Sequence, residues 1–298
     1  MNWVDPGLVA ELEAEGTTAH RIASDRDAWI ERFGGTALIS VKDREQTAPL
    51  LHDLEGWLAR EGLTLDRIYV RHLVRQPREN DQPILLRGDP AASARGTVRE
   101  SGLCYEVDFA TGYSVGLFCD QRANRRYLRS LAPRRVLNTF SYTCAFSVAA
   151  AVEGAETLSV DLSKSSLARG RRNWERNGLD LHGHRFLADD VLAVLPRLAQ
   201  RGETFDAIIL DPPTFGRSSP KRAFRAARDY EDLIALALAC AEPGAWLLLS
   251  TNCSSLTAEK LRSMAARVAR GKVTFHREPP QADFPPGFGS ATVWMKWR

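Results

Sequence analysis

Strand-like and helix-like segments alternate along the second half of the chain. Short apolar runs typical of buried strands are separated by longer segments in which apolar residues recur at helical spacing. The expected strands cover 135–140, 157–162, 184–189, 205–211 and 245–251, and the expected helices cover 146–155, 163–178, 190–202, 229–241 and 257–271. Because a helix follows each strand, the pattern predicts an α/β fold with a parallel, doubly wound sheet.

Two more strand-like segments, 272–278 and 291–298, end the sequence. The loop between them, 279–290, has no room for a crossover helix, which a parallel connection would need. We therefore expect an antiparallel pair at one edge. The result is a mostly parallel, seven-stranded sheet.

The first hundred residues show a different pattern. Helical and strand-like segments are mixed there, with helices expected near 7–15 and 47–61 and strands at 36–43, 66–74 and 82–88. We expect a small α+β domain over residues 1–95 and a main domain over residues 96–298. A hairpin of 103–109 and 113–120 is expected to lead into the main sheet.

Composition is that of an ordinary globular protein. The chain has 298 residues, of which 44% are hydrophobic and 26% charged. Its five cysteines include no CxxC pair and its histidines show no ligand spacing, so we expect no metal site and no disulfide framework. No apolar run approaches the roughly 20 residues of a membrane span, and no signal-peptide pattern is visible. We expect a cytoplasmic protein without a membrane partner, whose oligomeric state the sequence leaves open, a dimer included.

Basic residues gather in a few segments although the net charge is only +3. Residues 121–135, 169–176 and 216–228 are rich in arginine. The second segment is typical of a solvated helix face. The third is expected to be a loop, has no acidic residue and suits a partner rich in phosphate, such as RNA.

Polar side chains occur where the expected strands end, which is where open parallel sheets bind ligands. Asp161 ends the second strand, Asp189 and Asp190 follow the third, and Asp211 ends the fourth. The sequence contains neither GxGxxG after the first strand nor a P-loop motif, which disfavours dinucleotides and nucleoside triphosphates. Acids at these ends can accept hydrogen bonds from a ribose diol and an adenine amine. S-adenosylmethionine, a nucleoside without a pyrophosphate, fits this pattern.

Two prolines follow Asp211 directly, in the segment LDPPTFG at 210–216. Pro212 and Pro213 fix their own φ angles and carry no N–H group, so they keep the loop extended and leave its carbonyl groups available. An ordinary turn would account for a lone DPP sequence. Beside the other strand-end acids, it indicates a pocket.

The segment VLNTFSYTCAFSVAAAVEGAETLSVDLSKSSLARGRRNWERNGLD, the acids at 189–190 and LDPPTFG together resemble the Rossmann-like class I S-adenosylmethionine-dependent methyltransferases that modify large-subunit ribosomal RNA. YSVGLFCDQRANRR at 113–126 is similar to the GxFxDQR segment of that family. The resemblance covers roughly residues 100–278. It departs at Cys144, where the family usually has a glycine in a tight turn.

The resemblance implies roles for individual residues. Those expected to shape the cofactor pocket are Asn138, Phe140, Tyr142 and Thr143 at the methionine end, Asp161 at the ribose, Leu162 and Asp189 or Asp190 at the adenine, and Asp211, which is also expected to face the target base. Those expected to contact the substrate are Pro212, Pro213, Phe215, Arg122, Arg217 and Arg222.

Two chemistries remain open for the target base. LSTNCSSLT at 249–257 resembles the FSCSG segment of the cytosine-C5 branch, in which the cysteine is the nucleophile, so Cys253 and Asp211 are the expected catalytic residues of that interpretation. DPPTF instead resembles the guanine-N7 branch, which needs no cysteine. We favour cytosine C5, and methylation of a small molecule or a protein is the further alternative.

Overall fold

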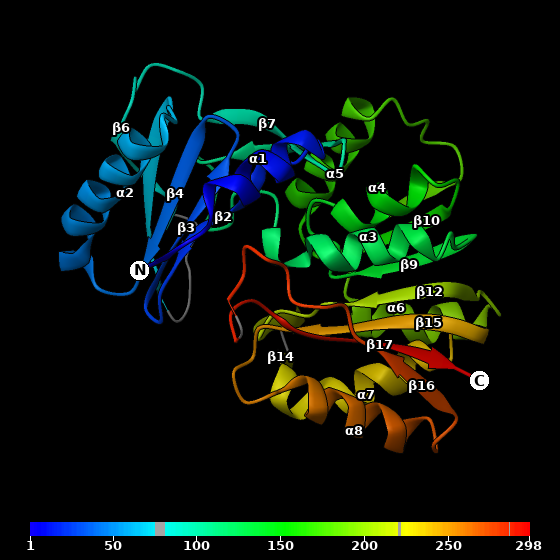
Figure 1. Ribbon diagram of the computed structural model, residues 1–298. Helices are drawn as coiled ribbons and strands as arrows, with labels where there is room; N and C mark the ends of the chain where they lie inside the picture. The colour runs from blue at the N-terminus through cyan, green and yellow to red at the C-terminus, as the bar shows by residue number, and fades with distance from the viewer. Residues whose placement is uncertain (75–80, 220–221, 286) are drawn as a thin grey trace. The chain divides into compact units, whose positions relative to one another are not determined.

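The computed structural model describes residues 1–74, 81–219, 222–285 and 287–298, without the side chains of 215–219 and 222–223 (Figure 1). Two compact units make up the chain. The first contains residues 1–119 and 280–287, and the second contains 120–279 and 288–298. The domain boundary expected after residue 95 thus lies inside the first unit.

The first unit is built on a six-stranded sheet with the order β1-β2-β3-β4-β5-β6. Its strands are β1 (Asn2–Trp3), β2 (Ala19–Ser24), β3 (Ala28–Phe33), β4 (Thr36–Val41), β5 (Arg67–His72) and β6 (Ile84–Arg87). Only β4 and β5 run parallel, and they are joined by α2 (Thr47–Glu61). Leu54 and Trp57 of α2 pack with Ile39 and Val70 of the sheet in one apolar core, to which α1 (Pro6–Ala14) also contributes.

The hairpin expected near residue 110 differs from the prediction. It consists of β7 (Arg95–Glu100) and β8 (Leu103–Asp108), which form a two-stranded sheet of their own and do not join the main sheet. The hairpin turns at Ser101 and Gly102, both of which have positive φ. The predicted second arm, 113–120, contains no strand.

The second unit confirms the predicted mostly parallel, seven-stranded sheet, with the order β11-β10-β9-β12-β15-β17-β16. Its strands are β9 (Arg135–Thr139), β10 (Glu156–Asp161), β11 (His184–Ala188), β12 (Phe205–Leu210), β15 (Ala241–Thr251), β16 (Val273–His276) and β17 (Ala291–Trp297). As expected, β17 pairs antiparallel with its neighbours. The chain moves outward from β9 to β11 and then returns to β12, so the switch point lies between β9 and β12.

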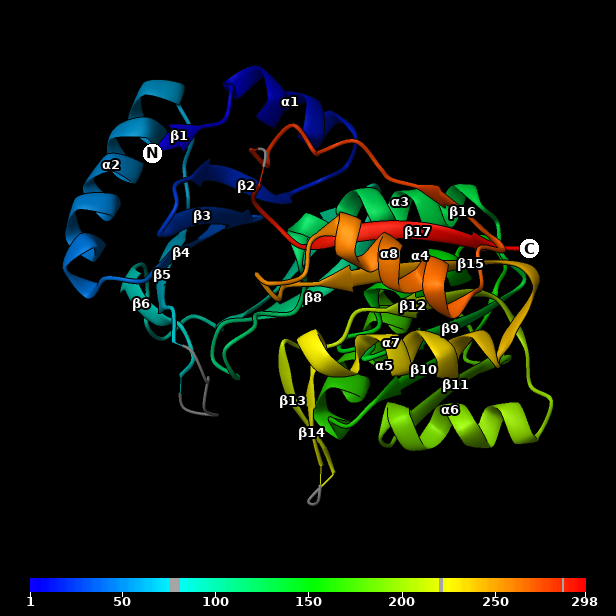
Figure 2. The same ribbon diagram turned by 90° about the horizontal axis from the view of Figure 1, so that it is seen from below.

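Helices cover both faces of this sheet (Figures 1 and 2). The helices are α3 (Arg122–Ser130), α4 (Ala145–Ala151), α5 (Lys164–Arg176), α6 (Val191–Gln200), α7 (Ala226–Leu238) and α8 (Ala258–Val268). Alternate residues of β12 divide between the two faces. Ile208 packs in the core of α6, α7 and α8, whereas Ile209 packs in the core of α3 and α4. Among the described residues no helix is long and apolar enough to cross a membrane.

The arginine-rich segment 216–228 is not the loop that the sequence predicted. Its backbone forms an antiparallel hairpin of β13 (Phe215–Ser219) and β14 (Arg222–Arg225), followed directly by the start of α7 (Figure 2). The first basic segment, 121–135, likewise contains helix α3.

Tyr230 joins the ends of the two central strands. It is fully buried in α7, and its hydroxyl oxygen lies 2.9 Å from the carbonyl oxygens of both Leu210 and Ser250. The same oxygen accepts a hydrogen bond of 2.8 Å from the Ser250 N–H. One side chain therefore satisfies backbone groups at the carboxyl ends of β12 and β15.

We expect Tyr230→Phe to lower the free energy of unfolding by about 1–3 kcal/mol, because it strands a buried N–H group without changing the packing of the ring. Urea denaturation measures the change. Tyr127→Phe is the matched control, since the described residues show ring contacts but no hydrogen bond for the Tyr127 hydroxyl. Equal stability of the two variants would contradict this role of Tyr230.

Candidate active site at the strand ends

The sheet brings the predicted acids to one edge. Parallel pairing sets Val160 opposite Thr139 and Asp161 opposite Ala188, and Leu210 is also paired with Thr139. The segments that follow β9, β10, β11 and β12 consequently leave the sheet side by side. Phe140, Asp161, Asp190 and Asp211 are partly exposed at this edge.

The loop after β9 has an unusual backbone. Phe140, Tyr142 and Cys144 have φ angles of 51°, 47° and 61°, which lie in the left-handed region that L-residues seldom adopt. Backbone hydrogen bonds hold the loop, since the Ser141 N–H donates to the Val160 carbonyl at 3.0 Å. Such local strain persists only where surrounding contacts impose it, and it concentrates at functional sites.

The carboxylate of Asp161 provides one of the contacts that impose the loop conformation. Its Oδ2 accepts a hydrogen bond from the Tyr142 N–H and its Oδ1 accepts one from the Ser163 N–H, both at 2.8 Å. Burial raises the pKa of Asp161, while the two N–H donors act in the opposite direction. The carboxylate is thus fixed in orientation. Leu162 beside it is 54% exposed, an apolar surface next to a polar group.

The two acids after β11 have different partners. Asp189 forms an ion pair with Arg197, whose hydrogen bond lowers the pKa of Asp189. Asp190 caps helix α6, where its Oδ1 accepts a hydrogen bond of 3.0 Å from the Leu192 N–H. The ion pair thus directs the Asp189 side chain toward Arg197 on α6, whereas the Asp190 side chain stays at the N-terminus of α6, beside the end of β11.

Two of the predicted pocket residues are buried under the loop. The Asn138 side chain donates a 2.8 Å hydrogen bond to Ser147 Oγ in α4. Thr143 is also buried, and its carbonyl accepts a hydrogen bond from Asn173 Nδ2 at 3.0 Å. These buried contacts fix the end of β9 and the loop after it to α4 and α5. Asn138 and Thr143 therefore stabilise the loop and are not exposed at the sheet edge.

Cys144 occupies the position at which the resemblance predicted glycine. It has a left-handed φ and is fully buried against Gly170 in α5. A Cβ atom on Gly170 would lie only 2.5 Å from Cys144 Sγ and 3.0 Å from Cys144 Cβ. Burial raises the pKa of the Cys144 thiol to about 12, so it stays protonated. The absence of a side chain at 170 therefore makes room for the cysteine.

Asp211 follows β12 and is the acid whose ionisation the structure disfavours most clearly at this edge. Burial raises its pKa to about 6, nearby Asp120 acts in the same direction, and a hydrogen bond from Ser250 and the charge of Arg125 oppose them. Pro212 is buried and Pro213 is exposed. Arg122 is half-buried at the start of α3, whereas the side chains of Phe215, Arg217 and Arg222 lie outside the described residues.

Cys253 lies two residues beyond β15, the strand that pairs with β12. It is half-buried, packs against the same apolar core as Phe140, and its Sγ lies 3.2 Å from Ser255 Oγ. Since Leu210 is paired with Leu249, Asp211 and Cys253 leave neighbouring strands at the same edge.

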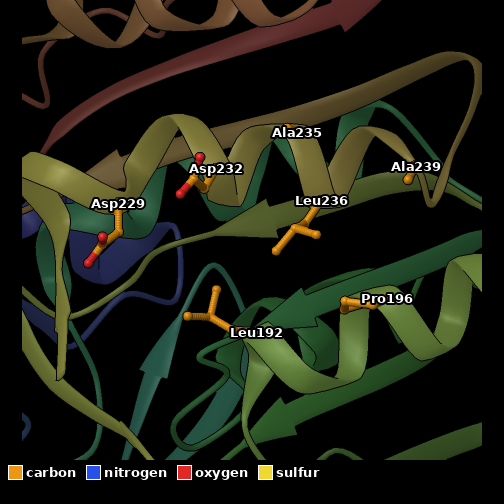
Figure 3. Close-up of a pocket in the computed structure, with 7 residues that line it drawn as sticks. All are labelled: Leu192, Pro196, Asp229, Asp232, Ala235, Leu236 and Ala239. Carbon is orange, nitrogen blue, oxygen red and sulfur yellow. The ribbon is translucent and has the colours of Figure 1, made fainter. Parts of the chain in front are cut away.

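An apolar groove of about 490 Å³ runs between α6 and α7 (Figure 3). Its lining residues are Leu192, Pro196, Asp229, Asp232, Ala235, Leu236 and Ala239. None of them was predicted as a site residue. Asp229 accepts hydrogen bonds from the Arg228 side chain and from the Arg225 N–H. The positive charge of Arg228 therefore offsets the negative charge of Asp229 at this end of the groove.

The strand order, the acids at one sheet edge and the strained loop are typical of α/β enzymes that bind a nucleoside at the carboxyl ends of their strands. A family model of S-adenosylmethionine-dependent methyltransferases matches residues 47–293, and the chain belongs to this family. The cofactor is S-adenosylmethionine, as the strand-end acids predicted.

Individual relatives agree with the family. Ribosomal RNA large subunit methyltransferase I of Erwinia tasmaniensis is 35% identical over 262 residues, which cover 85% of this chain and 65% of that protein. This chain thus spans just under two thirds of that relative's length. The crystal structure of SMU.776 complexed with SAH is 27% identical, with a TM-score of 0.86, and the match covers 98% of this chain and 79% of that one. An S-adenosylmethionine-dependent methyltransferase from Agrobacterium tumefaciens shares the fold at 20% identity, with a TM-score of 0.73 and coverage of 94% and 90%.

The contact between Cys144 and Gly170 predicts a coupled pair of substitutions. We expect Gly170→Ala to destabilise the wild type by about 1–3 kcal/mol, because the new methyl group overlaps the cysteine. In a Cys144→Gly background the cost should fall by about 1 kcal/mol or more. A double-mutant cycle by urea denaturation measures the coupling, and additive effects would rule out the proposed fit.

The raised pKa of Asp211 predicts a pH-dependent cost in stability. The native state binds this proton more tightly than the unfolded chain, so the contribution of Asp211 is most favourable below about pH 4 and is lost as the pH rises through about 6. The rise from 3.8 to about 6 corresponds to about 3 kcal/mol. Asp211→Asn cannot ionise, so its stability relative to wild type should increase from pH 4 to pH 7. Urea denaturation across this range tests it, and a constant difference would be the contrary result.

Proposed function

We propose that the protein methylates a base of RNA, with ribosomal RNA as the substrate. The observation that carries the proposal is the juxtaposition of Asp211 and Cys253 at adjacent strand ends, in a chain 35% identical to a relative named for ribosomal RNA methylation. The arginine-rich sequence 216–228 beside this edge supports a phosphate-rich partner. Such a substrate would make the protein a cytoplasmic enzyme of ribosomal RNA processing.

The cofactor roles are part of the proposal. S-adenosylmethionine supplies an electrophilic methyl group when bound. Asp161, oriented by two N–H donors, would accept hydrogen bonds from the ribose diol, and exposed Leu162 would cover the adenine. Asp190 would meet the adenine amine, since Asp189 is occupied by Arg197. Phe140 and Tyr142 would line the methionine end.

Cytosine C5 is the target that the cysteine supports. The Cys253 thiolate would add to C6 of the ring, which makes C5 nucleophilic. C5 would then form a bond to the methyl group as the bond from that group to the cofactor sulfur breaks, leaving S-adenosylhomocysteine. Loss of the C5 proton to a water molecule would expel the thiolate and restore the ring. Asp211 in its acid form can donate to N3 while its other oxygen accepts from the N4 amine. Its pKa of about 6 keeps part of the group protonated near neutral pH. Pro212 and Pro213, which follow Asp211 in the segment after β12, would contact the same base.

Guanine N7 is the second candidate, supported by the DPPTF sequence. In that reaction the ring nitrogen itself attacks, so no thiolate is needed. The Asp211 carboxylate would accept hydrogen bonds from N1–H and the exocyclic amine of the guanine. Either target must be single-stranded or turned out of a helix to reach the sheet edge.

We expect wild-type protein to transfer labelled methyl groups from S-adenosylmethionine to unmodified large-subunit ribosomal RNA, and Cys253→Ala to lose this transfer by several orders of magnitude. Asp211→Ala should lose transfer but keep cofactor binding, whereas Asp161→Ala should lose cofactor binding. Scintillation counting, calorimetry and identification of the labelled nucleoside provide the measurements.

The outcomes separate the candidates. Label on cytosine that depends on Cys253 supports the first reaction, and equal labelling by Cys253→Ala with label on guanine supports the second. If RNA stays unlabelled while the cofactor binds normally, the substrate is a small molecule or a protein. Loss of both transfer and cofactor binding in Asp211→Ala would refute the role assigned to that residue.

A further inference from the structure

A chain of buried side-chain hydrogen bonds leads from Trp294 to Asp211. Trp294 Nε1 donates to Asn124 Oδ1 at 2.9 Å, and Asn124 Nδ2 donates to Gln121 Oε1 at 2.9 Å. Gln121 Nε2 donates to Ser250 Oγ at 2.8 Å. Because Leu210 is paired with Leu249, Ser250 lies beside Asp211 on the neighbouring strand, and its hydroxyl acts to lower the pKa of the Asp211 carboxyl group. The first four residues are at most 3% exposed. They come from β17, α3, the turn before α3 and β15, and β15 and β17 are neighbouring strands of the main sheet.

The direction of every hydrogen bond follows from the indole. A tryptophan N–H can only donate, so Asn124 must receive it with its oxygen and turn its amide nitrogen to Gln121. Gln121 then accepts with its oxygen and donates with its nitrogen. Ser250 Oγ accepts that bond, which leaves its single proton for Asp211. Buried polar chains with such fixed direction are stronger than isolated pairs.

We propose that Gln121 is a positioning residue that, through Ser250, holds the Asp211 carboxyl group in one orientation and directs a hydrogen-bond donor to it. The proposal rests on the role of Asp211 proposed above. Gln121, the glutamine of the DQR segment, would thereby act on Asp211 without contacting the cofactor or the base.

Other charged groups also face Asp211. Asp120, next to Gln121, opposes its ionisation and Arg125 of α3 favours it. Tyr230 faces it from α7, and the negative charge of Asp211 contributes to raising the pKa of that phenol. None of these groups belongs to the relay, so substitutions of Gln121 leave them in place.

A titration of Asp211 without substrate tests the relay. The side-chain carboxyl signal, labelled with carbon-13 and assigned by its loss in Asp211→Asn, gives the pKa of this group directly. Gln121→Met keeps the length of the side chain but cannot hold the Ser250 proton in place. We expect it to raise the Asp211 titration midpoint by about half a pH unit or more, because the donor to the carboxylate weakens.

The same substitution in a Ser250→Ala background separates the relay from packing. If Gln121 acts through Ser250, Gln121→Met should cause no further change once the serine hydroxyl is gone. An equal shift in both backgrounds, or no shift in either, would overturn the proposal. Gln200→Met, on the exposed end of α6, is the matched control and should leave the titration unchanged.

Activity provides the second readout. With ribosomal RNA as substrate, Gln121→Met and Gln121→Glu should each lower kcat by about 10- to 100-fold with little change in KM or in cofactor affinity. The ionised glutamate has the same shape but can only accept hydrogen bonds, so Ser250 would turn its proton away from Asp211 and toward residue 121. Full activity of Gln121→Glu would contradict the proposal.

The two arms distinguish the possible failures. If wild type labels no RNA but the titration coupling is present, the substrate assignment fails and the relay stands. If wild type labels RNA and Gln121→Met leaves both kcat and the Asp211 titration unchanged, the relay fails and the substrate assignment stands. Retained cofactor binding shows in each case that the variant is folded.

Discussion

A parallel sheet covered by helices on both faces presents its functional groups at its ends. In the second unit, the middle of β12 is apolar on both sides, with Ile208 and Ile209 in two different cores. A polar group placed there would have to find a partner inside the protein. Thr139, a buried polar residue at the end of the neighbouring strand β9, has such a partner, because it donates to the Ile209 carbonyl at 2.6 Å. The chemistry is therefore concentrated where the strands leave the sheet, and the strand order decides which loops meet.

Local unfavourable features gather at that edge. Three residues of the loop after β9 have left-handed backbone angles, and burial raises the pKa values of Asp161 and Asp211. Each feature lowers stability on its own and needs surrounding contacts to persist. Tyr230 provides such contacts under β12 and β15, and Asn173 and Asp161 provide them under the loop. Contacts from the surrounding structure thus stabilise backbone angles and buried acids at the sheet edge that would be unfavourable without them.

Adjacent residues of one short turn connect to both loops beside the proposed base position. Gln121 reaches Asp211 through Ser250. Asp120 accepts hydrogen bonds from the backbone and side chain of Ser290, whose oxygen lies 2.7 Å from Asn252 Oδ1, next to Cys253. The DQR segment thereby connects the ends of β12 and β15 through side-chain hydrogen bonds.

The main sheet and its strand-end acids could be predicted from the sequence, because both depend on local periodicity and on residues adjacent to strands. The sequence did not predict β2 and β3, where Arg21 and Glu31 resemble solvent-exposed positions but form a buried ion pair at 3.5 Å. The sequence showed that Cys144 departs from the family pattern, but not that Gly170 packs against it. It also showed the DQR segment, but not that Gln121 bonds to Ser250, 129 residues away. These partners could not be predicted, because a side chain's burial and its hydrogen bonds depend on segments that folding brings together from distant parts of the chain.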